Sequence, residues 1–231
     1  MGQPRICQSA DELVPHRSSE QGWALLRTGL SVIDELPPTS AWRHHGPREG
    51  LEVLFTSRTR RGWRLDGVTT AVEAGSPWTV RYSITVDRQW ATLSAVVSGT
   101  TQRGSRRRTL RRFGASQWTV DGEWDPALDG CVDVDLESSA CTNTLPVHRL
   151  SLPSDAVHDR PAAYVRALDL GVERLEQTYQ QRPSDNDGMS FDYRAPQFGF
   201  NARLTYDRFG LVVDYPGIAT RVETTSDPFW R

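Results

Sequence analysis

Residues 78–97 read WTVRYSITVDRQWATLSAVV and carry the clearest structural signal in the chain. Apolar side chains occupy every second position from Trp78 to Val86, which is the period of a β-strand with two different faces. The loop Asp87-Arg88-Gln89 has the length of a hairpin connection, and residues 90–97 then supply a partner strand. The stretch therefore predicts a β-hairpin at the centre of an antiparallel sheet.

Similar signals continue on both sides of this hairpin. Leu51, Val53 and Phe55 alternate with polar neighbours, and further strands are predicted at residues 63–69, 109–113, 117–120, 132–136, 198–206 and 211–215. Residues 162–181 fit either a helix or strands, and periodicity alone does not decide between them. The fold class predicted is mostly β, as a single domain over residues 40–231.

Residues 1–39 differ from the rest of the chain. One weakly helical stretch runs from Glu20 to Leu36, and Pro37-Pro38 stops it. We expect this segment to be an appendage that is partly ordered or disordered.

The composition fits a sheet protein and excludes several classes of function. Apolar residues make up 37% of the chain, and the mean hydropathy is −0.53. The net charge of −2 gives no overall field that would attract nucleic acid, and all 27 basic side chains are arginine. The 3 cysteines cannot all pair, and we see no apolar leader or membrane-spanning run. We therefore expect a cytoplasmic protein with free thiols, no integral membrane segment and no nucleic-acid partner.

Asp133 and Asp135 are the first candidates for chemistry. They lie two residues apart on a predicted strand and so share a face, where they could act as an acid/base pair or hold a cation. The favoured interpretation is that they form the polar face of a strand that buries Val132, Val134 and Leu136. No metal site is expected, because His44 and His45 point to opposite faces and no zinc-binding spacing occurs. We also find no nucleophile elbow or phosphate-binding loop, and we expect no cofactor.

Six arginines cluster between residues 103 and 112. The favoured interpretation is an exposed edge hairpin, on which charge blocks aggregation between sheet edges. In the alternative, one face of the strand lines a cavity and grips a phosphate, sulfate or carboxylate group. The sequence leaves the role of this run open.

Two long motifs carry a family resemblance. Residues 128–136 (LDGCVDVDL) and 142–150 (TNTLPVHRL) resemble the bacterial family described as putative glycolipid-binding proteins, which typically read GC-x-DVDL and TNTLP-[IV]-x-RL. Three further stretches match the family pattern: the strand pair around VRY (residues 80–82), the pair Gln177 and Tyr179, and the ending over residues 207–217. The resemblance therefore covers about residues 41–222. The chain departs from the family at residues 138–141, which read SSAC, and at His148, where arginine is frequent.

The resemblance implies a β-roll, a long curled antiparallel sheet with an open, barrel-like form, and it favours strands over residues 162–181. A strongly curved sheet leaves a concave face that its own side chains do not fill, and an apolar chain can occupy that space. We expect ligand contacts from residues of the sheet and of the TNTLP motif: Arg81, Tyr82, Ile84, Trp90, Asn143, Arg149, Tyr179, Phe198 and Phe200.

Three functions remain open at this point. The first is a non-catalytic binding or carrier protein for an amphipathic, lipid-like small molecule, which could be a glycolipid. The alternative is a cofactor-free enzyme of the cyclase or isomerase type, with Asp133, Asp135, Tyr179 or Arg149 as acid, base or charge-stabilising groups. The third is a structural or interaction domain whose DVDL and TNTLP motifs only fix the fold, with Thr142, Asn143 and Thr144 bonding to backbone groups.

Overall fold

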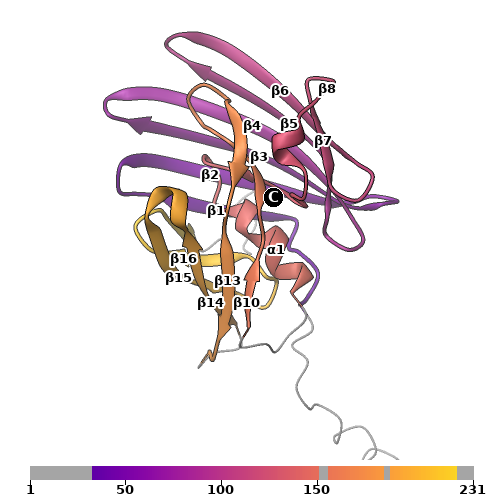
Figure 1. The fold of residues 1–231 in the computed structure, drawn as a ribbon. Helices are drawn as coiled ribbons and strands as arrows, with labels where there is room; N and C mark the ends of the chain where they lie inside the picture. Colours follow the sequence, from indigo (N-terminus) through magenta and orange to yellow (C-terminus); the bar gives the residue numbers. More distant parts are fainter. Residues whose placement is uncertain (1–32, 151–155, 185–187, 223–231) are drawn as a thin grey trace, which may run out of the picture. The chain divides into compact units, whose positions relative to one another are not determined.

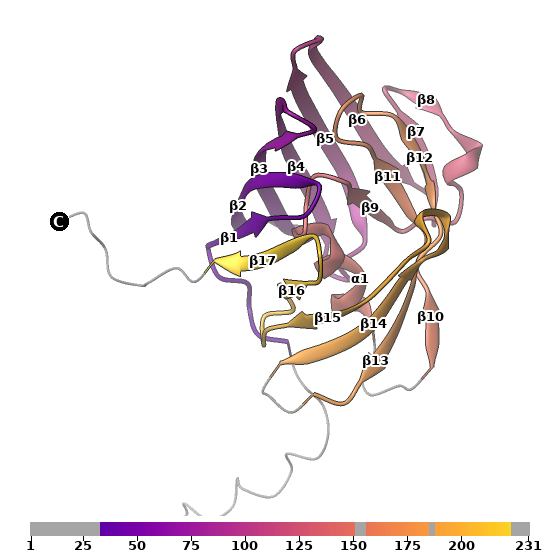
Figure 2. The ribbon, with the colours of Figure 1, turned by 90° about the vertical axis from the view of Figure 1, so that its left-hand side faces the viewer.

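The computed structural model describes residues 33–150, 156–184 and 188–222, which belong to one compact unit, Ser31–Arg231. Most of this unit is one 14-stranded antiparallel sheet that is not closed into a barrel. Figures 1 and 2 show this sheet curling around a central space. From edge to edge its strands are β10 (Val157–Asp159), β13 (Thr178–Arg182), β14 (Met189–Ala195), β15 (Phe200–Tyr206), β16 (Val212–Tyr215), β17 (Ala219–Val222), β1 (Thr39–His44), β2 (Arg48–Arg58), β3 (Gly62–Glu73), β4 (Ser76–Asp87), β5 (Thr92–Thr101), β6 (Gly104–Phe113), β7 (Gln117–Val120) and β8 (Glu123–Trp124).

The hairpin predicted from residues 78–97 is confirmed as β4 and β5. Its strands pair from Trp78 opposite Thr101 to Val86 opposite Thr92. The carboxylate of Asp87 accepts the amides of Gln89 and Ala91, each at 2.9 Å, and so fixes the loop. One detail of the prediction is wrong: Trp90 does not begin the second strand but lies in the loop, with φ at +64°.

Only some of the strands turn their apolar side chains inward and their polar side chains to solvent. Trp78, Val80, Tyr82, Ile84 and Val86 are all buried, as expected for an apolar face turned to the core. In β2 the rule is reversed, because Leu51 and Phe55 are 47% and 55% exposed whereas Glu52 is fully buried. The alternation correctly predicted a strand here, but polar groups inside the curl hold Glu52 and turn the apolar face outward.

A second, smaller sheet and the chain around it lie inside the curl. This sheet has the order β12 (Val172–Leu175), β11 (Ala162–Val165), β9 (Asp133–Leu136), with β9 parallel to β11. Residues 162–181 therefore form strands, as the family resemblance implied. Figures 1 and 2 show helix α1 (Thr144–Arg149) between the wing of long strands β2–β6 and the wing of β13–β16. The remaining elements are the short 3₁₀ turns η1 (Pro126–Leu128), η2 (Cys141–Asn143) and η3 (Pro196–Phe198).

The segment from Cys131 to Leu150, called the plug below, lies inside the curl of the sheet. None of its residues is exposed, and only Val132, Glu137, His148 and Arg149 are even partly so. The expectation of a concave face left empty by the protein's own side chains is therefore wrong where the plug packs against the sheet. The polar-face interpretation of β9 is also wrong, because β9 is buried on both faces, and Asp133 and Asp135 are 1% and 7% exposed.

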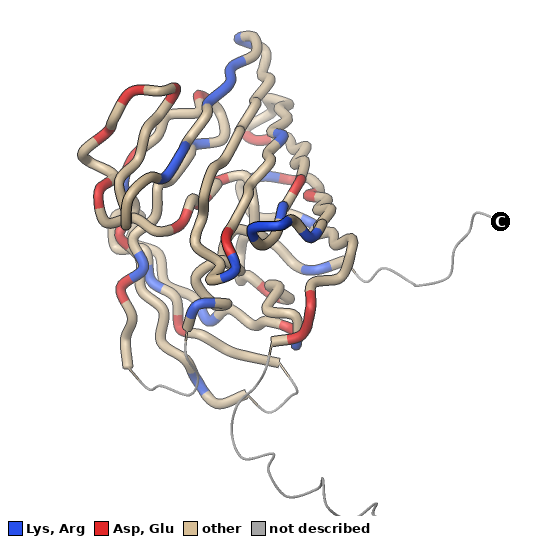
Figure 3. Tube along the Cα trace, turned by 90° about the vertical axis from the view of Figure 1, so that its right-hand side faces the viewer, with Lys and Arg blue, Asp and Glu red and all other residues tan. Residues whose placement is uncertain are grey.

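The prediction that the arginines between residues 103 and 112 lie on an exposed hairpin is confirmed by strand β6. Arg103, Arg106, Arg107 and Arg111 are exposed, and β7 pairs only with residues from Leu110 to Phe113, so that the earlier part of β6 is a free edge. Elsewhere the charged residues are mixed in sign, and Figure 3 shows basic and acidic positions spread along the described chain.

The predicted N-terminal appendage lies mostly outside the described residues. The helix predicted over residues 20–36 falls mostly outside the described residues, and residues 33–36 contain no helix. Strand β1 begins at Thr39, one residue before the predicted boundary. Within the described residues, no helix has the length and apolar character required to span a bilayer.

Candidate functional site

A pocket of about 260 Å³ lies where the small sheet, the plug and strands β14–β16 meet. It takes side chains from β2, β9, η2, β11, β12, β14, η3, β15 and β16, so that segments distant in sequence build it together. The volume lies just below the range of roughly 300–1,000 Å³ that small-molecule sites usually show. The pocket therefore has room for one ring or a short apolar segment of a ligand.

Five aromatic rings, called the aromatic wall below, line part of the pocket. They come from β11, β14, β15, β16 and η3 and touch one another: Tyr164 lies 5.4 Å from Phe198 between ring centroids, and Tyr193 lies 5.9 Å from Tyr215. Phe200 contacts both Tyr193 and Tyr215, at 6.1 and 5.8 Å. These distances are typical of packed aromatic side chains. Phe198 is 51% exposed and lies at the rim, whereas the three tyrosines are buried.

Polar groups complete the lining and are called the polar side below. They come from the start of β2 and from the plug: Arg48, Asp135, Glu137, Ser139 and Asn143. Thr142 donates a hydrogen bond of 2.6 Å to Oδ1 of Asp135. Burial raises the pKa of Asp135 to about 6, and the hydrogen bonds from Thr142 and from the Leu136 amide offset only part of this effect. The pocket is thus amphipathic, with a titratable carboxyl group on its polar side.

Arg48 and Glu137 neutralise each other at the pocket edge. Nη2 of Arg48 lies 2.8 Å from Oε1 of Glu137, and Nη1 donates to the Glu137 carbonyl. Nε of Arg48 also lies 3.6 Å from Oε2 of Glu73. The second carboxylate oxygen of Glu137 accepts the Ala167 amide at 2.8 Å. The guanidinium is therefore engaged by two carboxylates before any ligand enters.

A buried glutamate supports the polar side from behind, and the sequence analysis did not single it out. Glu52 accepts hydrogen bonds from the Tyr82 hydroxyl at 2.6 Å, from the Ala140 amide at 2.7 Å and from the Ser139 hydroxyl. His44, which is also fully buried, lies 3.5 Å from its other oxygen. These contacts hold Ser139 at the pocket wall. The local sequence pointed the other way, because a glutamate between Leu51 and Val53 in an alternating strand indicates a solvent-facing side chain.

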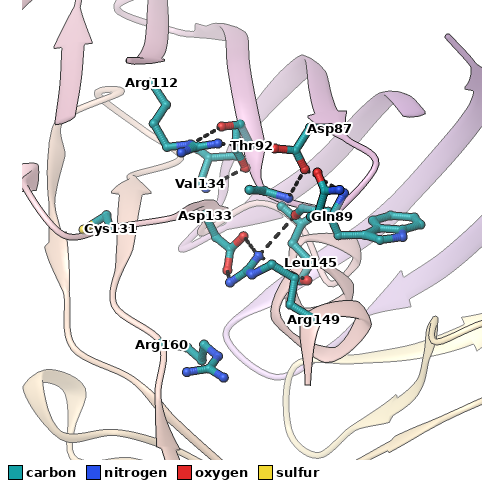
Figure 4. A network of polar contacts seen from close by, with 12 residues as sticks. Asp87, Gln89, Thr92, Arg112, Cys131, Asp133, Val134, Leu145, Arg149 and Arg160 are labelled. Atoms are coloured by element: carbon teal, nitrogen blue, oxygen red, sulfur yellow. Dashed lines mark hydrogen bonds and ion pairs between the residues drawn. The ribbon is translucent and has the colours of Figure 1, made fainter. Parts of the chain in front are cut away.

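A second polar cluster lies away from the pocket, around Asp133 and Arg149 (Figure 4). Both carboxylate oxygens of Asp133 accept hydrogen bonds from the Arg149 guanidinium, Oδ2 at 2.5 Å. Burial still raises the pKa of Asp133, although Arg149 works in the opposite direction. Nη1 of Arg149 also donates to the Trp90 carbonyl at 3.2 Å, and so holds the left-handed loop residue in place. We interpret this cluster as a structural clamp between the plug and the β4–β5 loop.

A hollow of about 440 Å³ beside this clamp is lined by Trp63, Trp90 and His148. Its aromatic faces are already used: His148 stacks on Trp90 at 3.7 Å, Trp63 lies 6.2 Å from Trp90, and Arg58 covers Trp63 at 4.6 Å. Burial lowers the pKa of His148 to about 4, so that its ring is neutral and Nε2 donates to the Phe209 carbonyl at 3.1 Å. This stack is complete without a ligand.

The structure divides the residues predicted from sequence into separate places. Asn143, Phe198, Phe200 and Asp135 line the pocket. Tyr179 lies behind it and donates to Oδ1 of Asn143 at 2.8 Å.

The other predicted residues do not line this pocket. Arg81 is exposed, whereas Tyr82 and Ile84 are buried core residues. Trp90, Arg149 and Asp133 belong to the clamp. Of the acid/base candidates, therefore, only Asp135 reaches the pocket.

Sequence reasoning missed most of the pocket lining. Tyr164, Tyr193, Tyr215 and Arg48 line it but were not selected. Tyr215 belongs to the DYPG motif and could have been found there, whereas Tyr193 and Arg48 carry no local signal. Among the described residues, no group of three or more His, Cys, Asp or Glu side chains is arranged to hold a metal ion.

Comparisons with known proteins agree with this architecture. The sequence model of the family described as putative glycolipid-binding matches residues 39–221. A crystal structure of a DUF1089 family protein from Pseudomonas aeruginosa is 28% identical, with a TM-score of 0.66, over 83% of this chain and 96% of that chain. A β-barrel-like protein with the domain of unknown function DUF1849 from Brucella abortus is 8% identical, with a TM-score of 0.48, over 82% of this chain and 96% of that one. No curated protein matches the chain. Because the family match covers most of the sequence and nearly all of the described domain, the chain belongs to the family described as putative glycolipid-binding.

Proposed function

We propose that this protein binds an amphipathic, lipid-like small molecule, without catalysis, in the pocket lined by Asp135 and the aromatic wall. The observation that carries the proposal is the mixed lining of the pocket. Its aromatic rings can bury an apolar group, and the carboxyl, amide and hydroxyl groups that the plug presents can fix a polar one. The family description supports the same class of ligand.

The size of the pocket limits how the ligand binds. The pocket has room for only one ring or a short segment of the ligand, because the plug lies inside the curl. The exposed ring of Phe198 at the rim then offers an apolar contact to the part that remains outside. Such a partly buried ligand is released more easily than one enclosed on all sides, which suits a carrier.

The polar side chains of the lining are held in place by neighbouring residues. Asn143 is held by Tyr179, Ser139 by Glu52, and Arg48 by Glu137 and Glu73. Groups engaged in this way are fixed in position, as a binding site requires. Asp135 alone combines a place in the pocket with a pKa near neutrality.

The test uses n-octyl glucoside below its micelle concentration and isothermal titration calorimetry. The informative variant is Phe198→Ala, which removes a rim contact from a short turn at an exposed position. Phe55→Ala is the matched control, because Phe55 is 55% exposed but lies on β2 outside the pocket. We expect saturable binding by the natural protein, about a fivefold loss for Phe198→Ala and no change for Phe55→Ala. An absence of saturable binding, or equal effects of the two variants, would overturn the proposal.

A further inference from the structure

The charges around the pocket do not balance. Asp135 and Glu137 contribute two carboxyl groups to the lining, and Arg48 contributes the single guanidinium. That guanidinium is engaged by Glu137 and also by Glu73 outside the pocket. Within the described residues, Asp135 has no ion-pair partner, since its contacts are hydrogen bonds from Thr142 and the Leu136 amide. An ionised Asp135 therefore leaves one uncompensated negative charge at the polar side.

The aromatic wall adds to the same preference. Tyrosine and phenylalanine rings carry negative electrostatic potential on their faces, and they attract ammonium groups, including quaternary ones. Five such rings lie around the pocket, at the ends of β11 and β14–β16 and in η3: Tyr164, Tyr193, Phe198, Phe200 and Tyr215. A carboxylate next to several rings is a chemical combination suited to a cation.

We infer that the polar end of the ligand is a cationic amine, which is held beside Asp135 and against the aromatic rings. This inference rests on the proposed function, because it specifies the headgroup of the ligand that binds in this pocket.

An anionic headgroup fits the same place poorly. A phosphate or sulfate would lie close to Asp135 and Glu137, where like charges repel strongly because little water screens them. The arginines of β6, which the sequence offered as an alternative grip for such a group, do not line the pocket. Arg108 and Arg112 donate instead to the carbonyls of Leu170 and Thr92. No free guanidinium is therefore available at this site, within the described residues, to hold an anion.

The titration of Asp135 gives this preference a pH dependence. Its pKa of about 6 leaves the carboxyl ionised near neutral pH and protonated in mild acid. Burial raises the pKa of the surrounding phenols, which therefore stay uncharged. The groups that face or influence Asp135 are Tyr164 on β11, Tyr179 on β13, Tyr193 on β14, Tyr206 on β15, Tyr215 on β16, Asp133 on β9, and the Arg48–Glu137 pair. Affinity for an amine should therefore fall as the pH is lowered through about 6.

The test compares three amphiphiles that share one octyl chain: octyltrimethylammonium, octyl glucoside and octyl phosphate. Near neutral pH we expect the ammonium compound to bind tightest and the phosphate weakest, with about a tenfold difference between these two. Asp135→Asn should remove most of this difference. Asp66→Asn is the control, because it deletes an exposed carboxylate outside the pocket and should leave the order unchanged.

The outcomes separate this inference from the proposed function. If no octyl compound binds saturably, or if Phe198→Ala has no effect on any of them, the proposed function fails and the inference fails with it. If all three bind and respond to Phe198→Ala, but octyl phosphate or octyl glucoside binds as tightly as the ammonium compound, only the headgroup inference is overturned. The same holds if Asp135→Asn keeps the preference of the natural protein.

Discussion

The hydroxyl of Thr142 lies 2.6 Å from Oδ1 of Asp135 and donates a hydrogen bond to it. Thr142 belongs to the TNTLP motif and Asp135 to the DVDL motif, and the same hydroxyl accepts the Leu136 amide at 3.3 Å. The two motifs that carry the family resemblance therefore fasten to each other inside the sheet. They form the plug, and the plug in turn supplies the polar side of the pocket.

Replacing Asp135 by asparagine should stabilise the fold near neutral pH. The pKa of Asp135 rises from its ordinary value of 3.8 to about 6 on folding, so the folded chain retains a proton that the unfolded chain releases. Raising the pH through this window therefore lowers stability, and the penalty is fully present above it, on the order of 2–3 kcal/mol. Asparagine never ionises and still accepts from Thr142. Urea unfolding at neutral and at acidic pH measures the effect.

Whether Asp135→Asn raises or lowers the free energy of unfolding distinguishes a functional carboxylate from a structural one. We expect the gain from Asp135→Asn to disappear as the pH falls toward 3.8. The control is Asp169→Asn, since the Arg166 guanidinium lowers the pKa of Asp169 to about 2 and its loss should bring no gain. A destabilised Asp135→Asn protein at neutral pH would show that the charged carboxylate supports the fold.

Breaking the clamp should cost much more than breaking a surface ion pair. Arg149→Met leaves Asp133 buried without its partner, which typically costs about 3–5 kcal/mol. It also removes the donor to the Trp90 carbonyl, so that tryptophan fluorescence should change. Chemical unfolding monitored by fluorescence measures both effects.

The comparison for the clamp comes from within the same chain. Arg166→Met breaks an exposed pair with Asp169 and should cost far less than Arg149→Met, because solvent screens exposed ion pairs. Adding Asp133→Asn to Arg149→Met should restore part of the lost stability, because the unpaired charge is then gone. If Arg149→Met and Arg166→Met were equally mild, Asp133 and Arg149 would not form a clamp.

The two buried thiols should be unreactive in the folded protein. Burial raises the pKa of Cys131 to about 11 and raises that of Cys141 well above its ordinary value. The thiolate is the reactive form, so that iodoacetamide should leave both unmodified in mildly alkaline buffer and label both in concentrated guanidinium chloride. Mass spectrometry of the peptides reads the result. Rapid labelling of the folded chain would contradict the packing of the plug.

A methyl group at Gly67 should disturb the support of the pocket. A Cβ there would lie 2.1 Å from Cζ of Tyr82, whose hydroxyl is fixed by Glu52 at 2.6 Å. We expect Gly67→Ala to cost about 1–3 kcal/mol. Gly99→Ala, where the nearest atom is the end of the Leu170 side chain at 3.2 Å, should cost less because that side chain can move. Thermal unfolding of the two variants checks this difference, and equal melting temperatures would contradict it.

The sequence predicted those parts of the fold that depend on neighbouring residues. The β4–β5 hairpin follows from one alternating run and one aspartate-led loop, and the pairing of β15 with β16 follows in the same way. Residues 162–181 needed the family resemblance, because β11 and β12 are short strands and the second partner of β11 is β9, which lies elsewhere in the chain.

The parts that could not be predicted depend on contacts between distant segments. Glu52 turns inward because the plug brings Ser139 and the Ala140 amide to it. Asp133 and Asp135 are both buried because β9 pairs in parallel with β11 inside the curl. Trp90 adopts a left-handed conformation that the Arg149 donor helps to hold. For Glu52, Asp133 and Asp135 a local pattern gave the strand, and long-range partners decided which way the side chains face.

An NMR titration of the isotope-labelled protein with octyltrimethylammonium tests ligand binding in the pocket most directly. We expect saturable shifts of the amide signals around the pocket, at residues 135–137, 193–195, 200 and 215, with little change around the hollow of Trp63, Trp90 and His148. Shifts confined to that hollow or to the outer face of β2 and β3, with unmoved signals at Asp135 and Tyr193, would contradict it.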